Sequence, residues 1–414
     1  MNKWFVLLCA CLITTNSSAQ KKNILFIGNS YTAANNLPQL LLDLSLSLGD
    51  SIFIDSYTPG GYTFQMHSTD VNALAKINSR PWDFVILQEQ SQRPSLSPPQ
   101  VAIDVYPYAR VLDSLIYLNN PCTETVFYMT WGRKYGDASN CASWPPVCTY
   151  LGMQDQLRNS YVQMANDNQA IVAPVGRAWQ QSWSQDSLIN LWSNDNSHPS
   201  LSGSYLAACV FYESIFRKSS VNAPFISSLS MNDAQFLQQV AYQTIIDSLS
   251  TWRIGADDSQ AGFAFAPSGL SVQFTEQCQN ANSFFWDFGD GNTSLSPQPL
   301  HVYTQAGVYQ VRLIADNNCD ADTSIQFVNV MTSGIEDVNA SDPCIKISAQ
   351  KSIEILCENW SKIEIYEVSG KRILSATSKS PGNSIAIDYF KEGIYILVFY
   401  SYTGNIVRLK YSNY

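Results

Sequence analysis

Histidine is scarce in this chain: its 414 residues include only three, His67, His198 and His301. Charged residues are also few, at 14% of the sequence, and 34 acidic side chains outnumber 24 basic ones. The resulting net charge of −10 would repel a phosphate backbone, which argues against a nucleic-acid partner. No CxxC pair or Cys/His cluster points to zinc, and we expect neither a metal nor another cofactor.

Long apolar runs are missing too. The first residues carry one lysine, an apolar run from Trp4 to Ile13 and then Ser17-Ser18-Ala19. That run is too short to span a bilayer, so we interpret residues 1–19 as a cleaved signal peptide, after whose removal no transmembrane segment remains. Two alternatives are an uncleaved N-terminal anchor and lipoprotein processing at Cys11, the last residue of the lipobox-like sequence LCAC. The prediction is an exported protein, either secreted or held at the outer cell surface.

Eight cysteines follow this N-terminal region, and an even number in an exported chain favours disulfides over metal ligands. Their order along the chain suggests the pairs Cys141–Cys148, Cys278–Cys319 and Cys344–Cys357. Cys122 and Cys209 are left over, and Cys209 lies in an apolar helical pattern typical of a buried thiol.

What the chain does have is 45% hydrophobic residues and a length that suggests about three domains. Between residues 21 and 255, buried β-branched runs alternate with helical patterns, which predicts a parallel sheet covered on both faces. Residues 260–333 and 340–414 alternate like strands around turn signals, without a helical period. We therefore expect one α/β domain followed by two small all-β sandwich modules. The five predicted strands of the first domain are residues 23–28, 51–57, 83–88, 125–131 and 170–175.

A serine follows the first predicted strand, in the sequence Gly28-Asn29-Ser30. Open α/β sheets place their active sites at the carboxyl ends of strands, where a helix N-terminus can stabilise an oxyanion. The alternative is that Ser30 is only an N-cap or turn residue. A serine nucleophile needs a base and a carboxylate to orient it, and Asp195 stands three residues before His198 in a predicted loop. Neither of the other histidines has such a partner in a suitable loop.

Together these segments resemble the SGNH/GDSL hydrolase superfamily, whose first block ends in Gly-Asp-Ser or Gly-Asn-Ser and whose last block is Asp-x-x-His-Pro. The resemblance covers about residues 22–253 and implies a flavodoxin-like three-layer α/β/α domain. It implies a catalytic triad of Ser30, His198 and Asp195. It also implies an oxyanion hole made of the Ser30 N–H, a glycine N–H and a side-chain amide. The chain departs from the family pattern where Gly-x-Asn-Asp is usual, reading LQEQS instead, as a poorly characterised branch of the superfamily does.

The segment Thr58-Pro59-Gly60-Gly61-Tyr62 resembles the family block that supplies the glycine N–H. Gly61 is slightly favoured over Gly60 for the oxyanion hole. Gln90 stands where the family has its asparagine, one methylene longer. An insertion after the fourth strand carries Tyr135 and Trp144, close in sequence to Trp131. These rings could stack on sugar faces, or they could simply pack on their own domain.

Two further resemblances concern the β-rich remainder. Residues 260–332, with Phe285-Trp286-Asp287-Phe288-Gly289-Asp290-Gly291, resemble a PKD domain, in which His301 would be structural. The C-terminal segment, with strand-like runs at 362–373 and 392–404, resembles the sorting domain of type IX secretion. That resemblance implies secretion machinery as a partner and passage across an outer membrane.

The sequence is thus interpreted as an exported SGNH-type serine esterase that removes ester groups, often acetyl, from an acylated carbohydrate. Carbohydrate as the substrate rests on fold-level analogy, the export route and the aromatic insertion. The alternative is a surface glycan-binding or adhesion protein whose activity is impaired by the change at Gln90.

Overall fold

The structure is a computed structural model that describes residues 21–246 and 249–331. In the C-terminal part it describes 336–337, 345–347, 352–355, 360–377, 384–386, 390–401 and 406–413. The chain divides into two compact units, Met1–Asp258 with Asn318–Asp320, and Ser259–Asn317 with Ala321–Tyr414. The predicted signal peptide lies outside the described residues. Across those residues, no helix combines the length and the apolar character that a bilayer crossing requires.

A parallel sheet forms the centre of the first unit, in the strand order β2-β1-β3-β4-β5. This is the flavodoxin-like order, so the predicted α/β fold class is confirmed. β1 and β3 are almost wholly buried apolar runs, as strands covered on both faces must be. The strands are β1 (Lys22–Ile27), β2 (Ile52–Tyr57), β3 (Phe84–Leu87), β4 (Glu124–Tyr128) and β5 (Ile171–Ala173).

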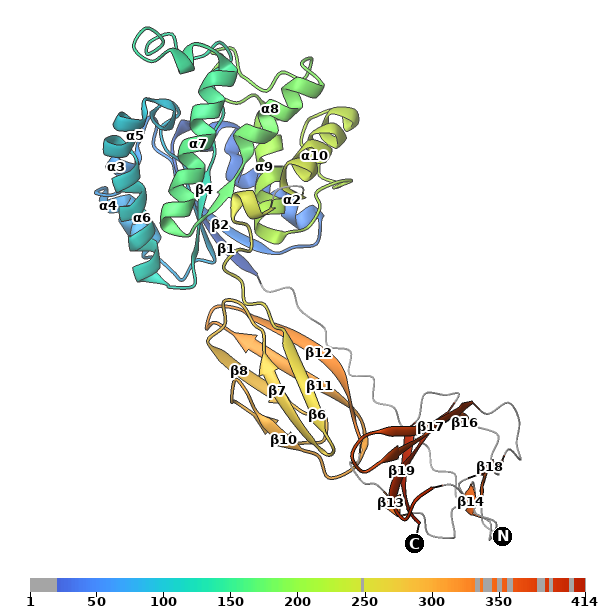
Figure 1. Cartoon of the computed structure of the whole chain (residues 1–414). Coiled ribbons are helices and arrows are strands. Elements are labelled where there is room, and N and C mark those ends of the chain that lie inside the picture. Colours follow the sequence, from blue (N-terminus) through green and yellow to red (C-terminus); the bar gives the residue numbers. More distant parts are fainter. Residues whose placement is uncertain are drawn as a thin grey trace, which may run out of the picture. The chain divides into compact units, whose positions relative to one another are not determined.

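Helices cover both faces of this sheet (Figure 1). α2, α8, α9 and α10 pack against one another on one face, while α3 to α7 gather on the other. The helices are α1 (Ser30–Ala33), α2 (Leu37–Ser47), α3 (Phe64–His67), α4 (Val71–Ile77), α5 (Pro98–Asp104), α6 (Tyr106–Asn119), α7 (Tyr150–Asn168), α8 (Val175–Gln185), α9 (Leu201–Phe216) and α10 (Met231–Ile246). Short 3₁₀ turns lie at η1 (Ala34–Asn36), η2 (Arg93–Ser95), η3 (Pro145–Cys148) and η4 (Leu249–Trp252).

The second unit begins with a sandwich of two antiparallel sheets, ordered β10-β7-β6 and β12-β11-β8-β9. Trp286 fills its core against Phe263 and Phe274, as expected of the tryptophan in the FFWDFGDG segment. His301 stacks on Phe288 and pairs with Asp290 at 2.8 Å, which gives it a structural role. The strands are β6 (Phe263–Ser268), β7 (Ser271–Glu276), β8 (Ser283–Asp287), β9 (Thr293–Ser294), β10 (Leu300–Val302), β11 (Gly307–Asp316) and β12 (Ala321–Val330).

The C-terminal part is also all-β, in the sheet orders β13-β20-β19-β16-β17 and β14-β15-β18. Within the larger sheet, β16, β17, β19 and β20 pair antiparallel, whereas β13 runs parallel to β20. The strands are β13 (Glu336–Asp337), β14 (Ile345–Ile347), β15 (Ser352–Ile355), β16 (Trp360–Glu367), β17 (Arg372–Thr377), β18 (Ser384–Ala386), β19 (Gly393–Ser401) and β20 (Ile406–Asn413).

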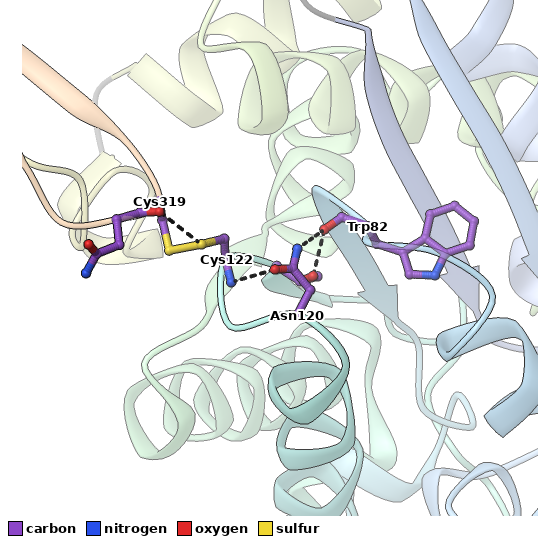
Figure 2. The surroundings of a disulfide bond; sticks show 6 residues. Trp82, Asn120, Cys122 and Cys319 are labelled. Carbon is purple, nitrogen blue, oxygen red and sulfur yellow. Dashed lines mark hydrogen bonds between the residues drawn. A yellow bond between two sulfur atoms is a disulfide. The ribbon is translucent and has the colours of Figure 1, made fainter.

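The disulfides agree only in part with the predicted pairing. Cys141–Cys148 is present as predicted, but Cys319 is bonded to Cys122, so the predicted Cys278–Cys319 pair is wrong (Figure 2). Cys122 and Cys319 are 197 residues apart, a pairing that local order along the chain could not reveal. Cys209 is a buried free thiol, as its apolar helical context indicated, and Cys278 is also free. Cys344 and Cys357 lie outside the described residues.

Candidate active site

Ser30 is the first residue of α1, directly after β1 and at the carboxyl edge of the sheet. Asn29 is the N-cap of this short helix, and its Oδ1 accepts a hydrogen bond from the N–H of Tyr31 at 3.1 Å. The turn is closely packed, since a Cβ at Gly28 would lie 2.6 Å from the Thr32 hydroxyl and 2.8 Å from Gln88 Oε1. A glycine is therefore required before the serine.

Asp195 and His198 lie in the loop before α9. An isolated bridge between Trp192 and Pro199 closes this loop, and the N–H of Ser193 donates to the carbonyl of His198 at 2.8 Å. The Asp195 carboxylate accepts from two backbone N–H groups in the loop, those of Ser197 at 3.0 Å and His198 at 2.9 Å. The carboxylate therefore organises the loop that carries it.

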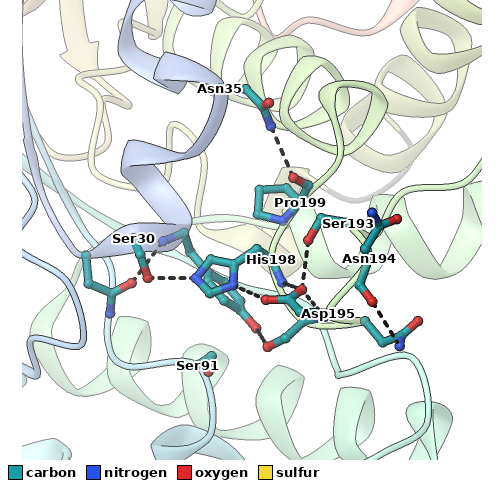
Figure 3. A network of polar contacts seen from close by, with 12 residues as sticks. Ser30, Asn35, Ser91, Ser193, Asn194, Asp195, His198 and Pro199 are labelled. Carbon is teal, nitrogen blue, oxygen red and sulfur yellow. Dashed lines mark hydrogen bonds and ion pairs between the residues drawn. The ribbon is translucent and has the colours of Figure 1, made fainter.

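The three predicted catalytic side chains form one continuous chain of hydrogen bonds (Figure 3). His198 Nε2 lies 2.9 Å from Ser30 Oγ, and His198 Nδ1 lies 2.5 Å from Asp195 Oδ2. This is the geometry in which a histidine can take the serine proton while a carboxylate holds its tautomer. The side chains of His198 and Asp195 are 39% and 50% exposed, so a substrate can reach the base directly.

Electrostatics keep Asp195 ionised. Partial desolvation raises the pKa of its carboxyl, but hydrogen bonds from His198, Ser193 and the loop N–H groups outweigh it, so the pKa lies well below its usual range. An ionised Asp195 stabilises the imidazolium that forms when His198 accepts a proton.

The two candidate oxyanion donors outside the serine turn, Gly61 and Gln90, differ in their local contacts. Gly61 has φ +74°, which suits glycine, and a Cβ there would meet open space. Its turn is tied to the serine turn because Asn29 Nδ2 donates to the carbonyl of Tyr62 at 2.9 Å. Gln90, by contrast, is engaged within its own loop: its Oε1 accepts from the N–H groups of Gln92 and Arg93 at 3.0 and 3.3 Å.

The three aromatic residues singled out in the sequence lie in different environments. Trp131 is fully buried, stacked between Tyr31 at 4.9 Å and Trp179 at 3.7 Å, so it offers no free face to a sugar. Its indole N–H donates to the carbonyl of Ser197. Trp131 therefore supports the loop of residues 193–198 that carries Asp195 and His198, which we call the catalytic loop because of its predicted role. Trp144 is half-buried and donates to the carbonyl of Ser95. Tyr135 alone is well exposed, at 73%.

Sequence reasoning missed the residues that hold the site in place. The Tyr31 hydroxyl bonds Ser197 Oγ at 2.6 Å, and the Tyr31 ring meets His198 edge-on at 5.1 Å. Gln88, inside the LQEQS segment, accepts from the N–H of Asn29 at 2.9 Å and from the Thr32 hydroxyl. The segment's departure from the family pattern was the only signal that could have drawn attention to Gln88.

His67 lies behind the serine turn rather than in the reaction path. It is fully buried, and its Nε2 is 2.9 Å from the carbonyl of Gly28. Burial lowers the pKa of His67 to about 4, although the hydrogen bond to Gly28 opposes that shift. Of the three histidines, His198 is the one whose ring contacts both a serine hydroxyl and a carboxylate.

Comparison with known proteins finds separate likenesses for the two regions. The α/β unit resembles a solved DUF4886 family protein from Bacteroides uniformis, with 16% identity over 55% of this chain and 95% of that chain, at a TM-score of 0.48. It also resembles a protein from Slackia heliotrinireducens assigned provisionally to the SGNH hydrolases, with 27% identity over 47% of this chain and 98% of that chain, at a TM-score of 0.38.

The family model of the PKD domain matches residues 259–332. The solved PKD1 domain of the Vibrio cholerae metalloprotease PrtV is 38% identical over 18% of this chain and 99% of that domain, at a TM-score of 0.17. The pre-pro-metalloprotease PrtV is 42% identical over 77 residues, which are 17% of this chain and 8% of that protein. This chain thus spans less than a tenth of its curated relative. Through residues 259–332, the chain belongs to the PKD-domain family.

Proposed function

We propose that this chain is an exported SGNH-type serine ester hydrolase that removes acyl groups, chiefly O-acetyl, from a polysaccharide. The observation that carries the proposal is the hydrogen-bonded series Ser30, His198 and Asp195, with 2.9 and 2.5 Å between partners. A base within hydrogen-bond reach of the hydroxyl, itself oriented by a carboxylate, is the arrangement that activates a serine.

The chemistry follows from these positions. Ser30 Oγ attacks the ester carbonyl while its proton passes to His198 Nε2, giving a tetrahedral intermediate. The Ser30 and Gly61 N–H groups are the proposed donors to its oxyanion, and Gln90 can join them only if its carboxamide turns away from its own loop. The intermediate then collapses with cleavage of the C–O bond to the sugar, and His198 gives its proton to the departing oxygen, which leaves as a hydroxyl group. A water molecule, deprotonated by His198, finally releases the acyl group from Ser30 as a carboxylic acid.

Export is supported by the two disulfides, because such bonds persist in oxidising compartments outside the cytosol. Recognition of the C-terminal module by a type IX secretion machinery is part of the proposal. The antiparallel pairing of β16, β19 and β20 supports a β-module of the expected kind in that place.

The second candidate is a surface glycan-binding protein with impaired catalysis. The observation that favours it is that both ends of the Gln90 carboxamide contact its own loop. Its Oε1 accepts from Gln92 and Arg93, and its Nε2, the group that would donate to an oxyanion, lies 3.5 Å from Ser91 Oγ and 3.4 Å from Gln92 Oε1. Loss of one oxyanion donor typically lowers the rate about 10²–10³-fold.

A fluorophosphonate probe tests the proposal, since it reacts covalently with activated serines. Mass spectrometry of the labelled chain should place the adduct on Ser30, and Ser30→Ala should abolish it. His198→Ala and Asp195→Asn should slow labelling by about 10³-fold or more, because each removes the base or its orientation. Asp195→Asn is the sharper variant, since its oxygen can still accept from the loop N–H groups while its amide cannot accept from His198 Nδ1. A folded sample that remains unlabelled would favour the glycan-binding candidate.

A further inference from the structure

A cavity of about 810 Å³ opens beside the catalytic loop. It lies between the insertion after β4, the start of α7 and one face of α8. Lys134, on its rim, contacts the catalytic loop directly, since its N–H donates to the carbonyl of Asn196 at 3.0 Å. Its ammonium group also reaches Asn190 Oδ1 at 3.4 Å. Through Lys134, the cavity therefore borders the loop that carries Asp195 and His198.

The charged side chains that line this cavity are all cationic. Lys134 and Arg177 both line it, and none of its described lining residues carries a carboxylate. Throughout the described residues, neither cation lies in an ion pair with an acidic side chain. Arg177 donates one hydrogen bond to Gln180 Oε1 at 2.7 Å, and its guanidinium carries further N–H groups. Two cations in one concave site, without an acidic partner, form a receptor for an anionic group.

The remaining lining suits a sugar ring. Tyr135 is 73% exposed at the rim, and Trp183 lies deeper, held by Tyr150 at 4.7 Å and Trp192 at 5.0 Å. Aromatic rings supply a flat apolar surface, and Gln180 and Ser184 supply groups that can bond hydroxyls. The Cys141–Cys148 disulfide borders the cavity through Cys148 and anchors the insertion.

We propose that this cavity is a subsite for an anionic sugar, carrying a carboxylate or a sulfate, in the polysaccharide whose ester Ser30 attacks. This inference rests on the proposed function and narrows its substrate to an acidic glycan. The chain as a whole has a net charge of −10, which disfavours an acidic polymer at long range. At physiological ionic strength, however, the Debye length is about 8 Å, so charges within the cavity dominate for a bound sugar.

Direct binding tests the subsite without requiring turnover. The full chain carrying Ser30→Ala is titrated with polygalacturonate, with dextran sulfate and with neutral dextran. We expect one of the anionic polymers to bind and neutral dextran to bind at least ten-fold more weakly. We expect binding to weaken as salt rises from 50 to 500 mM, because salt screens charge pairs. Comparison of polygalacturonate with dextran sulfate shows whether the site accepts a carboxylate or a sulfate.

Variants in the same Ser30→Ala background locate the binding. Arg177→Gln and Lys134→Gln should each weaken it about ten-fold, the typical loss of a charge-assisted hydrogen bond. Arg110→Gln is the matched control, because Arg110 is an exposed arginine on α6, outside the cavity. The subsite is wrong if neutral dextran binds equally well, if no polymer binds, or if Arg110→Gln weakens binding as much as Arg177→Gln. Fluorophosphonate labelling of Ser30 reports separately on the proposed hydrolase activity.

Discussion

Ser30 and His198 are separated by 168 residues in sequence, yet their side chains are 2.9 Å apart. The three histidines have the same side chain, but their surroundings give them different properties. His67 is kept neutral by burial, which lowers its pKa to about 4, and His301 is held by Asp290 and the Phe288 ring. His198 is partly exposed, next to an ionised carboxylate and a serine hydroxyl. Only its environment combines access, orientation and a proton donor.

Glu213 provides a test of pH dependence at the residue scale. Burial raises the pKa of Glu213 to about 7, although hydrogen bonds from Ser220 to its Oε1 oppose the shift. Its Oε2 has no partner, which fits a protonated carboxyl. Between about pH 4.5 and 7 the folded chain therefore holds a proton that the unfolded chain releases. The contribution of Glu213 to the free energy of unfolding therefore declines as pH rises through this window and is constant above it.

We expect Glu213→Gln to remove this decline, because glutamine stays neutral and keeps the oxygen that accepts from Ser220. The thermal unfolding midpoint of the variant minus that of the parent should increase as pH rises from 4.5 to 7. Above pH 7 this difference should stay constant. Thermal unfolding monitored by tryptophan fluorescence at several pH values measures it. Asp167→Asn, at an exposed carboxylate on α7, is the control. A constant difference between variant and parent at all pH values would contradict the expectation.

At the scale of elements, the approach of α9 to the catalytic loop depends on a glycine. A Cβ at Gly203 would lie 2.4 Å from the carbonyl of Leu191 and 2.4 Å from the Trp179 ring. Trp179 in turn stacks on Trp131, whose indole N–H supports Ser197. The helix, the tryptophan stack and the loop that carries His198 are therefore one packed assembly.

We expect Gly203→Ala to push α9 away from this assembly and to lower the stability by about 1–3 kcal/mol, as overpacking does. Because the loop shifts with the helix, labelling of Ser30 should also slow. Gly307→Ala is the matched control, since a Cβ there would lie 3.5 Å from the Tyr309 ring, an ordinary contact. Chemical denaturation and probe labelling measure the two effects. Unfolding and labelling like those of the parent would show that the helix tolerates the methyl group.

At the scale of the whole molecule, one disulfide joins two cysteines that their order along the chain would not pair. The turn before Cys122 is anchored to the segment that leads into β3, because Asn120 Nδ2 donates to the carbonyl of Trp82 and Asn120 Oδ1 accepts from the Cys122 N–H (Figure 2). Cys319 bonds to this turn from the short segment Asn318–Asp320, which belongs to the same compact unit. A cross-link between such distant segments restricts the unfolded chain strongly and should stabilise the fold.

A peptide map of the unreduced protein should contain the linked pairs Cys122–Cys319 and Cys141–Cys148. Iodoacetamide should modify Cys278 in the native chain, because that thiol is partly exposed. Cys209 should react only after denaturation, since it is fully buried and burial raises the pKa of its thiol. Mass spectrometry before and after denaturation separates the two thiols. Recovery of a Cys278–Cys319 peptide would contradict this connectivity.

Features encoded in short segments could be predicted from the sequence. Apolar runs predicted the parallel sheet, the alternation after residue 260 predicted β-sandwiches, and the spacing of Asp195 and His198 pointed to a base and its orienting acid. Such features depend on neighbours within a few residues, so no knowledge of long-range contacts was needed.

Contacts between distant segments, by contrast, became visible only in the folded chain. The burial of Trp131 between Tyr31 and Trp179 and the Cys122–Cys319 bond each depend on packing between segments far apart in sequence. The cavity beside the catalytic loop arises in the same way, from side chains on an insertion and on α8 that share no sequence pattern. Proximity of this kind comes from how strands and helices pack, and local sequence carries no direct record of it.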